Sequence, residues 1–508
     1  MIQFASLRSE RFQTFHEFQK SLHRGIYLPL YEITNEVEKT FAKSLRSNDT
    51  VLFALPFSSL PFYGTAKSLP AFAMVERAIK EGKLKPEKIV VEPTSGNTGL
   101  ALAEILNSLG HSFVMVVSRK ISSHFEMELV RRFNAKTLEL EDPSDTDSVL
   151  QFIETHNRTP FVLLVKLPIN YCPTDEPTGA IAYSKRLVER GKGKILMLDQ
   201  YTNSANPEIH KTVTAPSIIK GVDEYLKNGK KLFVFLSGGT FGTALGLTQF
   251  FIEKDIRVKL VIALPRGEDV FGIVDLDNAK RRRFYQELFS LLQKNAKSDL
   301  VEIVEIDKPL EKVSFMWKIN EEFSKNKDLD LTGGHSSMLV LWCALEYIEQ
   351  KQLNNAVCVL LFHDSSKRYD KPTETAAFEI DESVTVDETK VEKLIAEKGA
   401  RLLFVDPIPS FTPKEVKATV CEKIRSRFGV TLESWQIKNI EEVIQIDERS
   451  LKEAKFKEEF LSLIAQVAPS KPIVFVCPHG GTSKILASKM RSLGYENVFS
   501  LKGGLDSF

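Results

Sequence analysis

Short runs of Val, Ile and Leu that alternate with helix-like segments limit the folds open to this chain more than any other feature. KIVVEP, SFVMVVS, KLFVFLS, VKLVIALP and AVCVLLFHD recur between positions 51 and 369, separated by amphipathic stretches such as GLALAEILNSLG. Runs that are apolar throughout are typical of strands buried on both faces, which occur in parallel sheets joined by crossover helices. We therefore predict an α/β fold with buried parallel sheets.

A second and shorter pattern of the same type lies near the end of the printed sequence. RLLFVD and KPIVFVC are typical of buried strands, and SKILASKMRSLG is typical of the helix that follows the second strand. Residues 371–389 are rich in acidic residues and contain Pro372, which indicates a linker. We predict a large domain over residues 1–370, an acidic linker over residues 371–389 and a small α/β domain over residues 390–508.

Charge and cysteine usage narrow the classes of partner. The 68 Lys and Arg residues balance the 67 Asp and Glu residues, so no overall field attracts nucleic acid or a membrane surface. No apolar run approaches the roughly 18 residues of a membrane-spanning helix. The five cysteines are few and lack the spacing of a zinc site, so we expect no metal and a reducing compartment, the cytoplasm.

Two glycine-containing turns follow predicted strands and precede predicted helices. SGGTFG, from Ser237 to Gly242, is by itself a weak signal for a phosphate-binding loop, because an ordinary strand-to-helix turn is equally compatible with it. EPTSGNTGLALAEIL is more informative, because its polar groups at the start of a helix suit a carboxylate. Those groups belong to Thr94, Ser95, Gly96, Asn97 and Thr98.

Together with other segments, these turns resemble the fold-type II pyridoxal-phosphate (PLP) enzymes, and most closely the cysteine synthase and cystathionine β-synthase group. The resemblance covers nearly all of residues 25–370. It implies two parallel-sheet subdomains, with the cofactor in the cleft between them and a mobile subdomain at about residues 75–190. The segments that carry it, in order, are GIYLPL, FYGTAKSLPA, PTSGNTG, QYTNSANPEIHKTVTAP, SGGT, GGHSS and HDSSKRY.

The resemblance also implies a role for each polar residue of these segments. Lys67 forms the imine with the cofactor aldehyde and then removes the substrate α-proton. Asn97 donates to the ring hydroxyl, and Ser365 sits at the pyridine nitrogen. The phosphate is held by Ser237, Gly238, Gly239 and Thr240. The substrate carboxylate is held by Thr94, Ser95, Gly96, Thr98 and Gln200.

The serine at position 365 bears on the type of reaction. A serine hydroxyl, unlike an aspartate, does not stabilise a protonated pyridinium, so loss of a β-substituent through an aminoacrylate is favoured over transamination or racemisation. Leu69, Leu236 and Met338 depart from the family pattern, which has arginine, glycine and glycine there. We expect the substrate pocket to differ from that of the family accordingly.

The last 38 residues resemble the rhodanese (sulfurtransferase) fold. KPIVFVCPHGGTSKILASKM contains a strand that ends in a cysteine and a CxxGxT-type loop before a helix, and the sequence ends in GYENVFSLKGG and four further residues. Such a loop lowers the pKa of a thiol and stabilises a thiolate or persulfide. The expected persulfide loop comprises Cys477, Pro478, His479, Gly480, Gly481 and Thr482.

Joining the two parts predicts a cysteine-synthase-like enzyme. It would replace the β-substituent of a serine-derived amino acid through an aminoacrylate, with Cys477 as persulfide carrier. Its partners would be the amino-acid substrate, a sulfur donor and, as in relatives of the PLP part, a second copy in a homodimer. A β-eliminating lyase, such as a cysteine desulfhydrase or a serine/threonine dehydratase, is an alternative. So is a PLP-binding regulatory or sulfur-sensing protein.

Overall fold

The computed structural model describes most of the chain and divides it into two units. By their internal contacts the units are Met1–Pro372 and Thr373–Phe508. The described residues are 15–94, 96–119, 123–156, 159–168, 179–267, 270, 272–326, 329–369, 382–406, 433–436, 472–476, 481–492 and 497–502.

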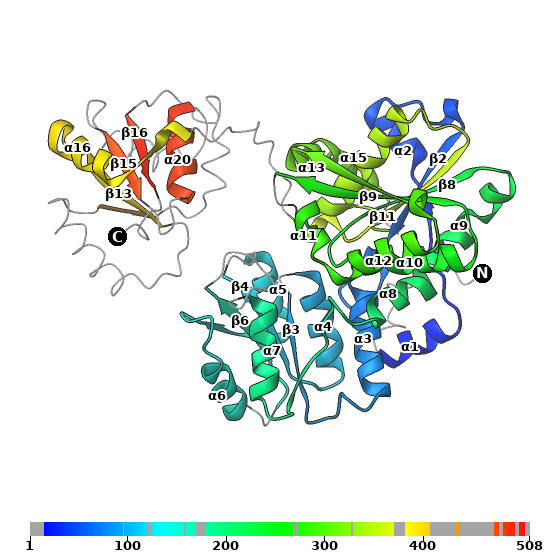
Figure 1. The fold of residues 1–508 in the computed structure, drawn as a ribbon, viewed down its shortest axis with the longest axis horizontal. Coiled ribbons are helices and arrows are strands. Elements are labelled where there is room, and N and C mark those ends of the chain that lie inside the picture. The colour runs from blue at the N-terminus through cyan, green and yellow to red at the C-terminus, as the bar shows by residue number, and fades with distance from the viewer. Residues whose placement is uncertain are drawn as a thin grey trace. The chain divides into compact units, whose positions relative to one another are not determined.

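Two sheets of parallel strands make up the first unit, as the strand pattern predicted (Figure 1). All neighbours run parallel except β1, which is antiparallel to β2. The order in the larger sheet is β1 (Tyr31–Glu32), β2 (Thr50–Pro56), β11 (Ala356–Phe362), β8 (Lys231–Ser237), β9 (Val258–Arg266) and β10 (Val301–Asp307). The order in the smaller sheet is β5 (Lys136–Glu139), β6 (Val162–Leu167), β4 (Phe113–Ser118), β3 (Ile89–Pro93) and β7 (Ile195–Met197).

Helices connect these strands and cover both faces of the sheets. α8 and α9 are joined by a π-helical turn, His210–Thr214, so these three elements form one continuous helical stretch. The helices are α1 (Phe15–His23), α2 (Thr34–Phe41), α3 (Ser68–Lys80), α4 (Asn97–Ser108), α5 (Ser123–Phe133), α6 (Asp147–Thr155), α7 (Ala180–Arg190), α8 (Ala205–Ile209), α9 (Ala215–Lys227), α10 (Gly242–Glu253), α11 (Leu276–Lys280), α12 (Arg283–Lys294), α13 (Pro309–Trp317), α14 (Ile319–Phe323) and α15 (His335–Gln350).

The apolar runs are buried because their alternate side chains enter two separate cores. In β4, Met115 packs in the cluster that contains the apolar face of α4. Val114 and Val116 point the other way, into the cluster that contains Tyr183 and Leu187 of α7. Side chains of a strand alternate between the two faces of its sheet, so a strand covered on both sides must be apolar at every position.

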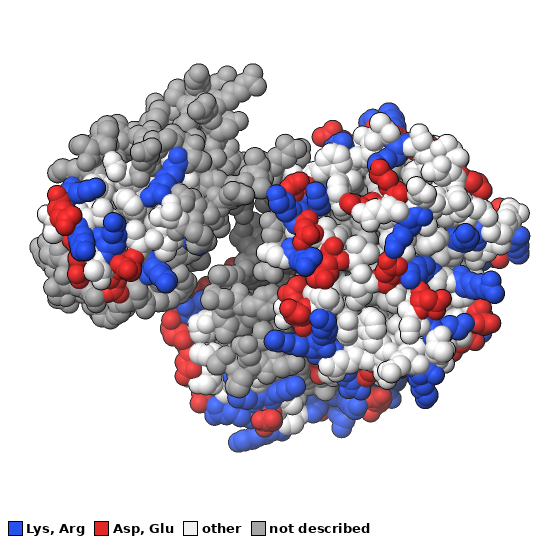
Figure 2. All heavy atoms as spheres, turned by 45° about the horizontal axis from the view of Figure 1, so that its top comes forward, with Lys and Arg blue, Asp and Glu red and all other residues white. Residues whose placement is uncertain are grey.

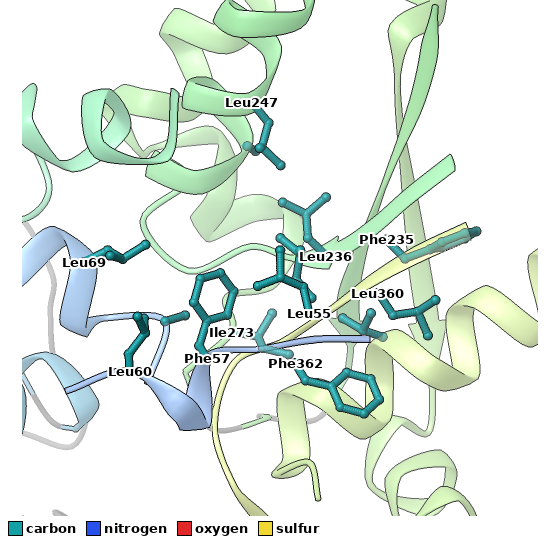
Figure 3. Packing of buried hydrophobic residues seen from close by; sticks show 14 of the residues in the cluster. Leu55, Phe57, Leu60, Leu69, Phe235, Leu236, Leu247, Ile273, Leu360 and Phe362 are labelled. Atoms are coloured by element: carbon teal, nitrogen blue, oxygen red, sulfur yellow. The ribbon is translucent and has the colours of Figure 1, made fainter. Parts of the chain in front are cut away.

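The larger sheet is covered on both faces in the same way (Figure 3). Leu236 and Leu55 lie on the side of Leu247 from α10, whereas Phe235 lies on the opposite side. The ring of Phe235 meets the ring of Tyr347 from α15, with 5.7 Å between their centroids.

The second unit contains a five-stranded parallel sheet, which confirms the prediction of a further small α/β unit. The expected linker, residues 371–389, contains part of this unit. Thr385–Val386 form a strand of the sheet, and the helix Glu388–Lys398 begins before the expected linker ends. The strand order is β12 (Thr385–Val386), β16 (Val498–Leu501), β15 (Ile473–Val476), β13 (Arg401–Asp406) and β14 (Glu433–Gln436). The helices are α16 (Glu388–Lys398) and α20 (Gly481–Ser492).

The described surface carries no block of like charge on the face seen in Figure 2, where basic and acidic side chains are interspersed. This distribution agrees with the formal net charge of +1. Within the described ranges, none of the helices is both long and apolar enough to cross a bilayer.

Candidate functional site

Lys67 directly precedes α3, at the end of a turn with an unusual backbone. Phe62, Tyr63 and Gly64 have φ angles of 58°, 74° and 55°, a region that is costly for residues with a side chain. Arg368 holds this turn, because its guanidinium donates to the carbonyl oxygens of Tyr63 and Gly64 and lies 4.1 Å from the centroid of the Tyr63 ring. The position of Lys67 therefore depends on a residue 301 positions later in the chain.

The surroundings of Lys67 favour its neutral form. Part of the side chain is accessible, but protein surrounds the amine closely enough that burial lowers the pKa of Lys67, an effect that the carboxylate of Asp364 opposes. The backbone N–H of Ala66 donates to the carbonyl oxygen of His363 at 2.7 Å. Burial, together with the charge of Lys67, lowers the pKa of His210 and of His363 to about 3. A neutral amine is the form that acts as nucleophile and base.

Asn97, the first residue of α4, lies against the loop that follows β11. Its Nδ2 donates to Oδ2 of Asp364 at 2.6 Å and to the hydroxyl of Tyr369 at 3.3 Å. Both amide hydrogens are thus used. Oδ1 of Asn97 and Oδ1 of Asp364 are also buried, and neither makes a hydrogen bond to the described residues. The resemblance implied that Asn97 donates a hydrogen bond to a ring hydroxyl. In the structure the NH2 group of Asn97 donates to Asp364, so the atom that remains for a further hydrogen bond is the amide oxygen, which is an acceptor.

Ser365 is buried and hydrogen-bonded to a carboxylate that the sequence analysis did not consider. Its Oγ lies 2.8 Å from Oδ2 of Asp330 and 3.1 Å from Oγ1 of Thr332. Asp330 and Thr332 come from the segment between α14 and α15, whereas Ser365 follows β11. The two segments meet at the carboxyl end of the larger sheet, where parallel α/β sheets bind their ligands.

In the loop between β8 and α10, neighbouring atoms lie so close to two of the glycines that a side chain would not fit there. A Cβ atom at Gly238 would lie 2.5 Å from the ring of Phe241, and one at Gly239 would lie 2.7 Å from the carbonyl oxygen of Gly272. Phe241 itself has a φ of 67°, in the left-handed region. The sequence SGGTFG therefore specifies a particular backbone path and not merely a flexible turn.

Several donors in this loop have no acceptor within the described part of the chain. None of the hydrogen bonds among described residues uses the backbone N–H groups of Gly238, Gly239 or Thr240. Oγ1 of Thr240 accepts from Nδ2 of Asn206 at 3.2 Å and from the N–H of Gly242 at 3.3 Å, so the hydroxyl proton of Thr240 is left to donate. Three N–H groups and a hydroxyl at the start of a helix form a suitable site for an anion.

The residues predicted to hold a substrate carboxylate lie close together, apart from Ser95, which is outside the described residues. Oγ1 of Thr98 donates to Oε1 of Gln200 at 2.8 Å, and Nε2 of Gln200 donates to the carbonyl oxygen of Pro93 at 3.3 Å. Gly96 immediately precedes α4, and Thr94 is buried. The carboxyl group of Glu92 fixes the backbone at Gln200, because its Oε1 accepts the N–H of Gln200 at 2.8 Å.

Four functional candidates were thus missed from the sequence. Glu92 stands beside the quoted TSGNTG turn, and Asp364 and Arg368 stand within the quoted HDSSKRY segment, so their motifs could have drawn attention to them. Asp330 lies outside the quoted segments, three residues before GGHSS and 35 residues before Ser365, and no pattern in the sequence connected it with Ser365.

The predicted persulfide loop lies mostly outside the described residues. Cys477, Pro478, His479 and Gly480 are not among them, while Gly481 and Thr482 begin α20. β15 ends at Val476, immediately before the cysteine.

The groups described above fit pyridoxal phosphate. Lys67 offers an amine with a lowered pKa, and the β8–α10 loop offers N–H donors without acceptors. Asn97 and Asp364 each offer a buried oxygen that lacks a partner. An aldehyde, a phosphate and polar ring substituents are the features of pyridoxal phosphate that such groups can hold. The fold and these groups agree with those expected of a fold-type II PLP protein.

Comparisons with known proteins agree with this class. Residues 58–282 match the family model described as pyridoxal-phosphate dependent enzyme, and residues 427–508 match the rhodanese-like domain. Residues 58–282 thus match a PLP-dependent enzyme family and residues 427–508 match a rhodanese-like domain, in agreement with the two resemblances seen in the sequence.

Characterised relatives of this chain include cysteine synthases. The cysteine synthase of Staphylococcus aureus is 28% identical over 210 residues, which are 41% of this chain and 55% of that protein. Cysteine synthase B of Pseudomonas aeruginosa is 25% identical over 308 residues, which are 60% of this chain and 83% of that protein. The chain thus spans about half the length of the first of these relatives.

Solved structures similar to this chain include an O-acetylserine dependent cystathionine beta-synthase from Helicobacter pylori. It has a TM-score of 0.48 and 21% identity, and the match covers 67% of this chain and 94% of that one. A hydrogen sulfide-producing enzyme from Fusobacterium nucleatum has a TM-score of 0.47 and 19% identity, with 68% and 95% covered.

Proposed function

We propose that the first unit replaces the β-substituent of a serine-derived amino acid, as cysteine synthases do, with sulfur as the incoming atom. The observation that carries this proposal is the amine of Lys67, which has a lowered pKa and lies near His210 and Asp364. His210 in turn lies 3.1 Å from Thr243 at the start of α10. His210 thus lies near both the amine of Lys67 and the helix start that offers donors for a phosphate.

Each residue of the proposed site has a defined task. Bound pyridoxal phosphate supplies an electron-withdrawing ring that stabilises negative charge at the substrate α-carbon. Lys67 would hold the cofactor covalently and, once free, would take the α-proton onto its Nζ and return it to the α-carbon after the Cβ–S bond has formed. Thr98 and Gln200 orient the substrate carboxylate. The Cβ–O bond of the substrate breaks, the leaving group keeps the electron pair, and a Cβ–S bond forms.

A product measurement tests this reaction. The full-length protein, loaded with pyridoxal phosphate, is incubated with sulfide and with O-substituted serines, serine, threonine or cysteine in turn. We expect a new thiol or thioether amino acid from an O-substituted serine, measured by mass spectrometry. Pyruvate or another 2-oxo acid as the sole product would instead identify a β-eliminating lyase. A cofactor spectrum that no amino acid changes would identify a regulatory protein.

For the rhodanese-like domain, we propose that Cys477 carries the incoming sulfur. The Cys477 thiolate takes the sulfane sulfur of a donor such as thiosulfate and releases sulfite. Two molecules of a small thiol then reduce the persulfide, are themselves oxidised to a disulfide, and release hydrosulfide for the β-replacement. The support for this step is the sequence CPHGGT before α20 and the match to the rhodanese-like model. The amino-acid product is formed at the first unit, so Cys477 is not needed when sulfide is supplied directly.

Cys477→Ser is therefore expected to separate two activities. Turnover with free sulfide stays at the wild-type rate, whereas turnover with thiosulfate and a small thiol falls to the rate seen without the donor. Cys421→Ser, which removes another cysteine of the same unit, is the matched control and keeps both activities. Equal turnover of Cys477→Ser with sulfide and with thiosulfate, at wild-type rates, would exclude the carrier role.

A further inference from the structure

Ser365 belongs to a buried hydrogen-bonded group that ends on a carboxylate. Oγ of Ser365 is 2.8 Å from Oδ2 of Asp330, and Oγ1 of Thr332 is 2.5 Å from Oδ1 of the same residue. The relative exposures of Ser365, Asp330 and Thr332 are 5%, 7% and 3%. Because these groups are almost inaccessible to solvent, their hydroxyl protons are donated to neighbouring protein atoms and not to water.

Asp330 can only accept in this group. Burial raises its pKa, but the hydrogen bonds from Thr332 and Ser365 and the charge of Lys367 outweigh that effect, so the pKa of Asp330 lies below its usual value and the carboxyl group is ionised at neutral pH. The ammonium group of Lys367 is 3.3 Å from Oδ2 of Asp330. An ionised carboxylate has no proton to give.

The hydroxyl proton of Ser365 is already used in a hydrogen bond, so Ser365 has no proton to donate to a further group. A hydroxyl has a single proton, and Thr332 gives its proton to Oδ1 of Asp330. Ser365 gives its own proton to Oδ2. Its Oγ meanwhile accepts the backbone N–H of Lys367 at 3.2 Å. What Ser365 can still offer to a further group is a lone pair.

We propose that Asp330 makes Ser365 a hydrogen-bond acceptor toward the ring nitrogen of the bound cofactor, so that this nitrogen carries a proton. The proposal rests on the proposed function and on the position at the ring nitrogen that the family resemblance implies for Ser365. A pyridine nitrogen beside an oxygen that can only accept is stabilised in its protonated form, and the proton comes from solvent. The negative charge of Asp330, acting through Ser365, balances the positive charge of the ring, so Asp330 is a positioning residue.

This proposal reverses the expectation drawn from the sequence. A serine alone was expected to leave the ring nitrogen unprotonated. A protonated ring withdraws electrons more strongly, so the negative charge on the substrate α-carbon is better stabilised. The residue that decides between the two cases is Asp330, which lies far from Ser365 in the sequence.

The protonation state can be measured directly on the loaded protein. The full-length protein is reconstituted with pyridoxal phosphate labelled with ¹⁵N in the ring, and the nitrogen resonance is compared with that of the free cofactor above and below its own ring pKa. We expect the wild-type resonance at the protonated position. In Asp330→Asn, whose amide can donate to Ser365, we expect the resonance to shift to the unprotonated position. Thr332→Val is the control, and it keeps the protonated position because the Ser365–Asp330 pair remains.

Each outcome of this experiment is decisive. A wild-type resonance at the unprotonated position overturns the proposal while leaving the proposed function intact. A protonated resonance in both the wild type and Asp330→Asn shows that Asp330 has no part in it. If Asp330→Asn does not fold, Ser365→Ala serves instead and is expected to give the same unprotonated position. If the wild type takes up no labelled cofactor, the proposed function fails as well.

Discussion

Lys67→Ala is expected to abolish the visible absorbance of the protein-bound cofactor and to lower turnover by roughly 10²–10⁴-fold, the range for loss of a general base. Alanine has no amine to attach the aldehyde or to take the α-proton. The measurement is an absorbance spectrum after reconstitution with pyridoxal phosphate. It is followed by borohydride reduction and peptide mass spectrometry, which locates the modified lysine in the wild type.

A matched control distinguishes loss of the amine from a general loss of structure. Lys83 is exposed and follows the helix that Lys67 precedes. Lys83→Ala is therefore expected to keep both the wild-type spectrum and the wild-type turnover. Should Lys67→Ala keep the colour of the wild type, or should borohydride fix the cofactor on another lysine, our assignment of Lys67 would be wrong.

Glu92→Gln is expected to change how stability depends on pH. Burial raises the pKa of Glu92 to about 8 from its ordinary value of 4.5, although the backbone N–H groups of Gln200 and Asp199 act in the opposite direction. Between these two values the folded protein keeps a proton that the unfolded chain has lost. The stabilisation from Glu92 is therefore complete below the unfolded pKa and is lost as the pH rises to about 8. Its full size corresponds to about 5 kcal/mol as an order of magnitude.

Urea unfolding across this pH range measures the effect. The wild type is expected to lose stability with rising pH more steeply than Glu92→Gln, since glutamine does not titrate. Glu87→Gln, which changes an exposed glutamate shortly before β3, should keep the wild-type slope. Equal slopes for the wild type and Glu92→Gln would mean that Glu92 is already ionised in the folded protein.

The strands and the glycine turns could be predicted from the sequence because local chemistry determines them. The run FVMVV of β4 is apolar at every position, since Met115 and Val116 enter different cores. Gly238 is likewise required by Phe241, three residues later, whereas Gly239 is required by the carbonyl oxygen of Gly272 in a distant segment but is recognised from the same glycine pair. A pattern within one segment is sufficient to recognise both features.

The polar partners could not be predicted, because they depend on segments that are distant in the sequence. The amide group of Asn97 donates a hydrogen bond to Asp364, which lies 267 positions later in the sequence. The proton of Ser365 is taken by Asp330, which no motif contains. Leu69, Leu236 and Met338, which depart from the family pattern, are each 0% exposed, so they fill core space at positions where the pattern suggested a change of pocket.

The segment after β11 makes several of the contacts that position the site. Within seven residues it supplies the carbonyl oxygen that fixes Ala66, the carboxylate that meets Asn97, and the guanidinium that holds the turn before Lys67. An insertion or deletion there would displace all of these contacts together. Evolution of a new substrate preference in this protein is therefore expected to proceed through loops that can vary independently, while the length of this segment stays constant.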